Sequence, residues 1–280
     1  MNKNTHYIPA VLALALPLLT VVIFLFYPLL QTILPTFFPA GFSLTAYTGF
    51  FSDSLNRIIF FRSIRLSVLT TVICMAAGIP AAYYLSRLSG VKKRVLNSLI
   101  LFPLLTNAVV RGFAWISILG KNGLMNQLLT GLHLTKAPVQ LLYTDGAIVV
   151  GSVYLFLPVM ISSLTSVMEQ ISVDIEEAAH TLGAGTCAVF LRIITPLALP
   201  GIITGSVLVF AGTISAYTTP TLLGGNKKMM LATLLYQQSS TLSDWNAAAV
   251  ISLIMIVISL GIMKVFTSVA SSMDRRKSYV

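Results

Sequence analysis

The chain has 280 residues, of which 56% are hydrophobic and 9% are charged, and its net charge is +10. A soluble domain carries about a quarter charged residues to keep its surface hydrated, so this composition excludes an ordinary soluble domain and predicts a polytopic membrane protein. The basic residues lie in short runs beside apolar segments, as at residues 92–94 and 275–277, which is typical of charges that set membrane topology and argues against nucleic-acid binding.

Six apolar segments are long enough to cross a bilayer core of about 30 Å as helices, which takes roughly 20 residues each. They are residues 8–33, 63–86, 95–119, 144–167, 197–220 and 245–268. The first segment is too long for the apolar core of a signal peptide, so we expect it to be retained. The sequence therefore predicts an all-α membrane protein with six transmembrane helices.

Lysine and arginine in short loops favour the cytoplasmic side of a membrane. The basic loop at residues 87–94 and the basic tail at residues 270–280 both lie inside if the N-terminus is inside. We therefore expect a multi-pass membrane protein with both termini in the cytoplasm.

The first outer loop, residues 34–62, is rich in aromatic residues, and Pro35, Pro39 and Gly41 argue against one continuous helix within it. Two interpretations stay open: an interfacial aromatic belt around a re-entrant or surface helix, or a docking site for a specific partner. We group residues 1–62 as an N-terminal transmembrane helix with this loop, and residues 63–269 as the main membrane domain.

The third apolar segment carries polar and aromatic residues that share a helical spacing. Pro103, Asn107, Arg111 and Trp115 recur every four residues, which predicts a stripe on one face of one helix. Because an ionisable group inside a membrane is a functional candidate, we predict that Asn107, Arg111 and Trp115 line a translocation pathway or an outer gate. Alternatively, Arg111 extends to the outer interface, since it lies about 24 Å along the helix from Val95.

Further pathway candidates lie in the fourth and fifth segments. Pro158 predicts a kink in the fourth helix, where hydroxyl groups can satisfy the freed carbonyl. In the fifth segment, the spacing of Gly201 and Gly205 allows a close helix approach. Packing explains Thr213 and Tyr217 less well, so we add these two residues and Pro158 to the predicted pathway.

The sequence gives no sign of catalytic chemistry in this chain. No Asp or Glu lies deep in any apolar segment, which argues against a proton-coupled carrier, because such carriers need buried carboxylates. No glycine-rich phosphate loop is present, so we expect the chain to bind no ATP. The histidines lack metal-ligand spacing, and no nucleophile is paired with a base. We therefore predict neither a catalytic site nor a metal site.

The loop between the fourth and fifth segments is the most informative part of the sequence. Asp174 is placed to cap a helix, and Glu177 completes a capping-box spacing. Gly183, or Gly185, supplies the left-handed residue that commonly ends a helix. Between these ends lies an apolar stripe that includes small residues: Ile175, Ala178, Ala179 and Leu182. This amphipathic helix either docks on another protein or packs on its own membrane bundle.

A wider pattern in this loop is Glu177-Ala178-Ala179 followed by Gly183, Phe190, Ile193 and Pro196. It resembles the EAA signature of ABC importer permeases with the type I (MetI-like) fold, although Thr195 replaces the usual leucine. The resemblance implies that a cytoplasmic coupling helix, at about residues 172–192, is seated in a cleft of a separate ATPase subunit. The residues to which it assigns this coupling are Asp174, Glu177, Ala178, Ala179, Leu182 and Gly183.

Other stretches resemble the spermidine/putrescine branch of that family, which also includes permeases for opines and aminoethylphosphonate. They are residues 102–107, 110–111, 122–123, 143–144, 157–158 and 222–225. The resemblance implies a permease subunit that moves a polyamine or a related small polar solute, delivered by an extracytoplasmic solute-binding protein. The other partners it implies are an ATPase dimer, which holds the ATP, and a second permease that is a different chain; no cofactor is bound by this chain. A secondary carrier or channel that works without an ATPase is the alternative.

Overall fold

The computed structural model describes residues 15, 17–38 and 41–273, and these residues form helices without a β-strand. Among them, four helices are long and apolar enough to cross a membrane, or up to six if each of two bent helix pairs is one span. The all-α fold is therefore as predicted. The chain divides into two compact units, Met1–Arg57 with Leu235–Ile254 and Ile58–Leu234 with Met255–Val280.

Three of the predicted spans are single helices: α4 (Ser54–Ser86), α8 (Asp145–Met168) and α15 (Trp245–Met273). Helix α4 begins inside the predicted outer loop, because the Asp53 carboxylate accepts a hydrogen bond from Leu55 N at 2.8 Å and caps the helix there. Helix α8 passes through Pro158 without a break. Of the predicted basic tail, residues 270–273 continue α15, and residues 274–280 lie outside the described part of the chain.

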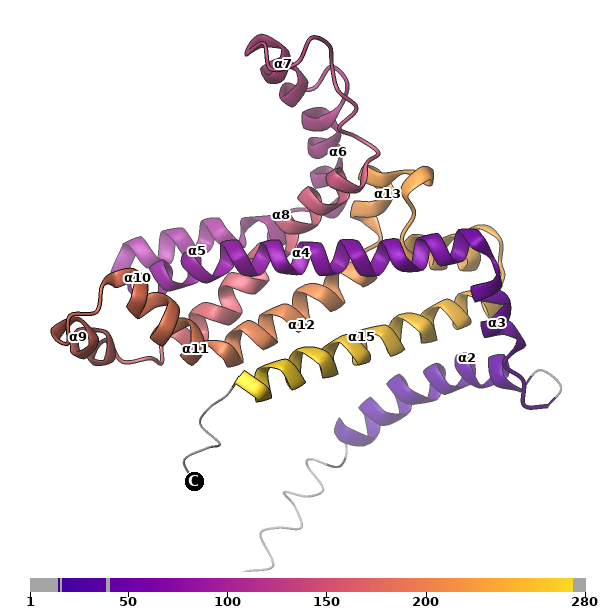
Figure 1. The fold of residues 1–280 in the computed structure, drawn as a ribbon. Helices are drawn as coiled ribbons and strands as arrows, with labels where there is room; N and C mark the ends of the chain where they lie inside the picture. Colours follow the sequence, from indigo (N-terminus) through magenta and orange to yellow (C-terminus); the bar gives the residue numbers. More distant parts are fainter. Residues whose placement is uncertain (1–14, 16, 39–40, 274–280) are drawn as a thin grey trace, which may run out of the picture. The chain divides into compact units, whose positions relative to one another are not determined.

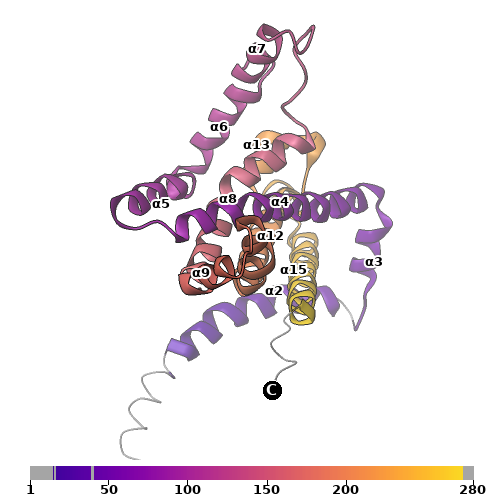
Figure 2. The same ribbon diagram turned by 60° about the vertical axis from the view of Figure 1, so that its left-hand side comes forward.

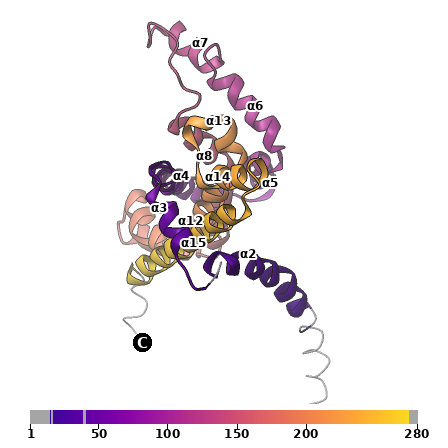
Figure 3. The ribbon, with the colours of Figure 1, turned by 90° about the vertical axis from the view of Figure 1, so that its right-hand side faces the viewer.

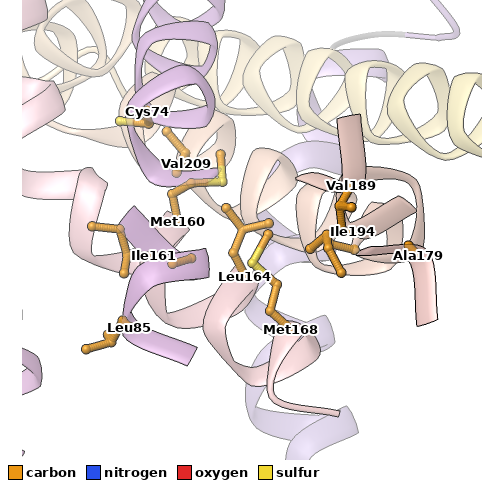
Figure 4. Close-up of a cluster of buried hydrophobic side chains, with 12 residues drawn as sticks. Cys74, Leu85, Met160, Ile161, Leu164, Met168, Ala179, Val189, Ile194 and Val209 are labelled. Atoms are coloured by element: carbon orange, nitrogen blue, oxygen red, sulfur yellow. The ribbon is translucent and has the colours of Figure 1, made fainter. Parts of the chain in front are cut away.

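The core of the second unit lies between α8 and α12 (Leu199–Ser215), which run side by side (Figure 1). Met160, Leu164 and Met168 recur every four residues along α8 and are completely buried. Figure 4 shows them with Val209 of α12 and Cys74 of α4, which belong to the same buried cluster. This apolar cluster joins three helices into one packed body.

Met160 also explains how closely these helices approach one another. A Cβ atom at Gly78 of α4 would lie 2.7 Å from Met160 Cγ, and a Cβ atom at Gly205 of α12 would lie 2.6 Å from Met160 Sδ. Both distances are too short for two non-bonded atoms, so a larger residue at either position would have to displace the buried Met160 side chain. A Cβ atom at Gly201 would lie 3.1 Å from Val167, which agrees with the close approach predicted from the glycine spacing.

The third predicted span is not one continuous helix, so the prediction of a single straight helix there was wrong. Helix α5 (Gly90–Leu105) ends before Thr106, α6 (Ala108–Leu119) starts after Asn107, and the chain bends by 94° between them (Figure 2). Asn107 causes the restart, because its side-chain oxygen accepts hydrogen bonds from Val109 N at 2.8 Å and Val110 N at 3.4 Å. Beyond the bend, α6 leads to the short helix α7 (Leu124–Gly131).

The fifth predicted span is also interrupted. Helix α12 ends at Ser215, and Pro220 lies in a separate helix, α13 (Thr218–Gly224), which contacts α6 and α8 (Figure 3). A helix that continued through residue 220 would lose the hydrogen bond that proline cannot donate. The chain becomes extended at Ala216, with φ −66° and ψ 125°, and restarts so that Pro220 falls in the first turn of α13, where no such bond is needed.

The first unit contains the described part of the predicted first span, a helical segment at Pro17–Phe37 that includes α2 (Tyr27–Phe37). Residues 8–14 and 16 of that span, and Pro39 of the outer loop, lie outside the described residues. The loop is not one continuous helix, because a separate helix α3 (Thr45–Ser52) follows α2. Tyr47 of α3 holds the two helices together, since its hydroxyl lies 2.7 Å from Thr36 Oγ1 and its ring stacks on Phe37.

Candidate functional site

The predicted coupling segment forms a short helix, α9 (Val173–Thr181), whose start differs from the prediction. Ser172, not Asp174, is the N-cap: Ser172 Oγ accepts a hydrogen bond from Asp174 N at 3.2 Å. Asp174 lies in the first turn, where its negative charge interacts favourably with the positive end of the helix dipole. The predicted capping box between Asp174 and Glu177 was therefore wrong, because the cap lies two residues earlier.

The end of α9 is as predicted. Gly183 has φ +85°, which is the left-handed conformation that glycine adopts without strain. Two hydrogen bonds close the helix, from Gly183 N to His180 O at 2.9 Å and from Ala184 N to Ala179 O at 3.0 Å. This pair of bonds is a Schellman motif, which stops the helix and turns the chain back toward the bundle.

The predicted apolar stripe of α9 is divided between two faces. Ile175, Ala178 and Leu182 are exposed, and Leu182 has 89% of its surface accessible. Ala179 is buried against the second unit, so its assignment to a docking face was wrong. Glu177 is exposed beside the apolar residues. The helix thus packs on its own bundle through one side and presents a small apolar surface on the other.

The chain after α9 anchors this helix to the core. The predicted coupling helix at about residues 172–192 is several short elements: α9 is followed by α10 (Thr186–Val189) and by a π-helical turn at Phe190–Ile194. Val189 and Ile194 are buried in the same cluster as Leu164 and Met168 of α8 (Figure 4). Movement of α9 would therefore be transmitted directly to the packed end of α8.

A polar network on the inner side of α9 also joins it to α4. The Arg87 Nε group donates to Glu176 Oε1 at 2.8 Å, and the Tyr83 hydroxyl donates to Glu176 Oε2 at 2.7 Å. Arg87 Nη2 forms a further bond to Glu176 Oε1. The carboxylate of Glu176 is almost completely buried, with 8% of the residue exposed.

Two predicted pathway residues meet at the bend between α5 and α6. Asn107 caps α6, and Arg111 Nη1 donates to Pro103 O at 3.0 Å and Thr106 O at 3.2 Å. The predicted stripe on one straight helix was therefore wrong. Instead, Arg111 satisfies carbonyl groups that the interruption leaves without helical partners.

The other pathway candidates are not gathered at one place. Trp115 of α6 packs edge-to-face on Tyr154 of α8, with ring centroids 5.7 Å apart. Thr213 is buried and bonds back to Val209 O at 2.7 Å, and Pro158 is buried within α8. Tyr217 lies half-exposed between α12 and α13. Thr213 and Pro158 are thus packed inside the chain.

The first unit contains a cavity of about 310 Å³ that the sequence did not indicate. Its lining includes Asp53 and Asp244. Each carboxylate caps a helix start, Asp53 by accepting from Leu55 N and Asp244 by accepting from Ala247 N. Among the described residues, no group of three or more His, Cys, Asp or Glu side chains could hold a metal ion.

Comparison with known proteins shows what kind of molecule carries these features. Residues 74–279 match the family described as binding-protein-dependent transport system inner membrane component. The chain belongs to this family. It is 30% identical over 222 residues to the spermidine/putrescine transport system permease protein PotB of Escherichia coli K12, which covers 79% of this chain and 80% of PotB. It is 33% identical over 199 residues to the molybdenum transport system permease protein ModB of Mycobacterium tuberculosis H37Rv, covering 70% and 73% of the two chains.

Solved structures agree with the permease fold. A chain of a bacterial ABC transporter involved in the import of alginate superposes with a TM-score of 0.80 at 15% identity, covering 98% of this permease and 99% of that chain. A chain of an alginate transporter in complex with an alginate-bound periplasmic protein gives a TM-score of 0.79 at 16% identity. The permease is thus an inner-membrane subunit of an ABC importer, as expected for a transport subunit.

The residues that hold the predicted coupling segment in place were not recognised from the sequence. The sequence assigned Arg87 only to membrane topology, and Tyr83 and Glu176 received no role. Two signals were available. Tyr83 and Arg87 are four residues apart and so share a helix face. Glu176 and Glu177 are neighbours on a helix, where successive side chains point about 100° apart, so that both cannot face the same partner.

Proposed function

We propose that α9 is the coupling helix of this permease and that its exposed face binds the ATPase subunit of the importer. The observation that carries this proposal is the exposed apolar surface of Ile175, Ala178 and Leu182 on a helix whose other face is fixed to the bundle. Leu182 is 89% exposed, so a partner that covers it removes apolar surface from water and thereby stabilises the complex. Ala178 is small enough to let the backbone of α9 lie close to the partner.

The acidic residues beside this surface can fix the orientation in which the ATPase binds. Asp174 and Glu177 are exposed and have no Lys or Arg within ion-pair distance among the described residues. Their charges are therefore free to meet basic groups of an ATPase and to fix its orientation. The residues proposed for coupling are thus Asp174, Glu177, Ala178 and Leu182, with Gly183 as the helix end.

The remaining partners follow from membership of the family. We expect an ATPase dimer to bind and hydrolyse ATP, a second and different permease chain to complete the membrane path, and a solute-binding protein to deliver solute outside. We expect both termini to be cytoplasmic. In this scheme, ATPase closure biases the membrane helices between inward-open and outward-open states.

The proposed solute is a polyamine or a related small amine. Similarity to the PotB permeases supports this choice, because it covers four fifths of both chains. The comparable identity to ModB permeases favours a small oxyanion as the second candidate. Positively charged residues around Asp145, namely Arg62, Arg65 and Lys228, would suit such an anion better than a cation.

Transport by the complete importer tests these proposals. The permease, its ATPase, its second permease and its binding protein are reconstituted in liposomes and supplied with radiolabelled spermidine or molybdate. We expect spermidine uptake that requires ATP and no saturable uptake of molybdate. Uptake that continues without ATP and follows a proton gradient would establish the alternative carrier. Saturable molybdate uptake without spermidine uptake would contradict the polyamine proposal and leave the assignment as an ATP-driven importer unchanged.

A further inference from the structure

Helix α9 has only two buried side chains, Glu176 and Ala179, and they differ in how firmly they can hold the helix to its neighbours. Ala179 ends in a methyl group, whereas Glu176 reaches toward the end of α4 and binds the side chains of Tyr83 and Arg87. An apolar contact as small as that of Ala179 resists separation weakly. The position of α9 relative to α4 therefore depends mainly on Glu176.

Arg87 connects Glu176 to more than one part of the membrane domain. It follows the last residue of α4, and besides Glu176 its Nη1 group donates to Met168 O and Ile171 O, both at 3.3 Å. Met168 is the last residue of α8. One guanidinium group thus joins the end of α4, the end of α8 and the inner face of α9.

Tyr83 completes the connection. Its hydroxyl donates to the second oxygen of Glu176, and its ring lies 5.6 Å from Arg87 Cζ and packs on Phe190 at 5.1 Å. Arg87 and Tyr83 thus each bind one oxygen of the Glu176 carboxylate, and they also contact each other. A planar guanidinium and a rigid ring leave few alternative geometries for this group.

We propose that Arg87, Glu176 and Tyr83 are positioning residues that form a rigid link, through which movement of α9 is passed to α4 and α8. This inference depends on the proposed function, since α9 must first be moved by an ATPase. Burial supports the assignment: the side chains of Arg87 and Glu176 are 20% and 10% exposed. Ionic contacts shielded from water hold their geometry more strongly than exposed ones.

A second ion pair at the same end of the unit offers a matched control. Lys93 Nζ lies 3.0 Å from Glu169 Oε1, but these side chains are 33% and 40% exposed. Exposed ion pairs contribute little to rigidity. Loss of the Glu169 charge should therefore leave the link unchanged, although it removes a carboxylate from the same end of the unit.

The test measures the distance between α9 and α4 in two nucleotide states of the complete importer. Spin labels are attached at Val173→Cys and Tyr84→Cys, which are 48% and 63% exposed. Cys187 is exposed and is replaced by serine, whereas Cys74 is buried and stays. Electron spin resonance then gives the distance between the labels, without nucleotide and after trapping with ATP and vanadate.

With the native link, we expect the same narrow distance distribution in both states. In Glu176→Gln we expect the trapped state to shift or broaden, while the ATPase still co-purifies, and the coupling of ATP hydrolysis to the binding protein to fall about tenfold. Glu169→Gln should behave like the native protein. Tyr83→Phe, which keeps the ring and the ion pair, should give a smaller broadening.

Each outcome decides the inference. If Glu176→Gln keeps the native distribution in both states, the link is only a structural contact and the inference is wrong, even if the variant is less stable. If Glu176→Gln does not assemble, Tyr83→Phe decides: a broadened trapped state supports the link, and an unchanged one overturns it. A native complex that holds no ATPase and traps no vanadate would overturn the proposed function, and the link with it.

Discussion

Gly183 and Gly185 lie on either side of Ala184 but have different backbone conformations. Gly183 has φ +85°, whereas Gly185 has φ −71°, and a Cβ atom at either position would meet nothing within 4 Å. An alanine at residue 183 would therefore meet no steric clash but would be strained by the left-handed backbone conformation. An alanine at residue 185 would meet neither a clash nor this strain.

We predict that Gly183→Ala destabilises the end of α9 by about 1 kcal/mol, because an L-residue is strained at positive φ. Hydrogen exchange of the α9 amides should become about fivefold faster. Gly185→Ala is the matched control and should leave the exchange rates unchanged. Equal acceleration in both variants would show that loss of glycine flexibility, and not the left-handed conformation, is responsible.

Asp145 neutralises several cations at the start of α8. Arg62 Nε and Lys228 Nζ each lie 3.6 Å from its carboxylate, and Arg65 pairs with its other oxygen. In Asp145→Asn these cations would keep their mutual repulsion and lose their common partner. We predict a loss of about 1–2 kcal/mol in the free energy of unfolding, between the values of exposed and buried pairs, measured as a lower melting temperature of the purified permease.

Asp244→Asn is the control for this prediction. Asp244 caps α15 through Ala247 N at 2.9 Å, and asparagine caps helices as well as aspartate does. No Lys or Arg among the described residues forms an ion pair with it. The melting temperature of Asp244→Asn should therefore stay near that of the native protein, and a loss equal to that of Asp145→Asn would contradict the ion-pair explanation.

At the scale of helices, the contact of α8 with α12 depends on the absence of a side chain at Gly205. We predict that Gly205→Leu forces the helices apart and lowers the free energy of unfolding by about 3 kcal/mol or more, because Met160 is completely buried and has no room to move. Gly261 of α15 is the control, since a Cβ atom there would meet nothing within 4 Å. Denaturation of the isolated chain in detergent should show a large loss for Gly205→Leu and little change for Gly261→Leu.

Helices α4, α8 and α15 could be predicted because their apolar length alone requires a membrane span. The interruption at Thr106 and Asn107 could not, because an asparagine within an apolar run is equally compatible with a polar helix face and with a helix cap. The contacts of Arg111 with Pro103 O and Thr106 O, which stabilise the bend, exist only after folding.

The same limit applies to the candidate site. The end of α9 was predictable because glycine is the residue that most readily adopts positive φ. Its start was not, since Ser172 and Asp174 are both good N-caps. The spacing of Tyr83 and Arg87 shows that they share a helix face, but which of Glu176 and Glu177 faces them is decided only by the packing of α9 on the bundle.

At the scale of the second unit, α4 and α8 are connected by charged groups at both ends. Arg62 and Arg65 of α4 bind Asp145 at the start of α8, and Arg87 after α4 binds Met168 O at its end. Between these ends the two helices share the apolar cluster around Met160. Helix α8 has 24 residues and is about 36 Å long at roughly 1.5 Å per residue, so these two groups of charges lie near opposite surfaces of a bilayer.

This arrangement leads to a prediction about which end faces the cytoplasm. Cys187 lies exposed in α10, and Cys74 is buried, so a single native thiol reports on the inner end. If α9 binds an ATPase, a membrane-impermeant maleimide should label Cys187 in inverted vesicles of cells that express the permease alone, but not in intact cells. Lys136 lies in the exposed loop before α8. A Lys136→Cys variant in which Cys187 is replaced by serine should be labelled in intact cells but not in inverted vesicles. Labelling of Cys187 from outside would place α9 away from any ATPase and contradict the proposed function.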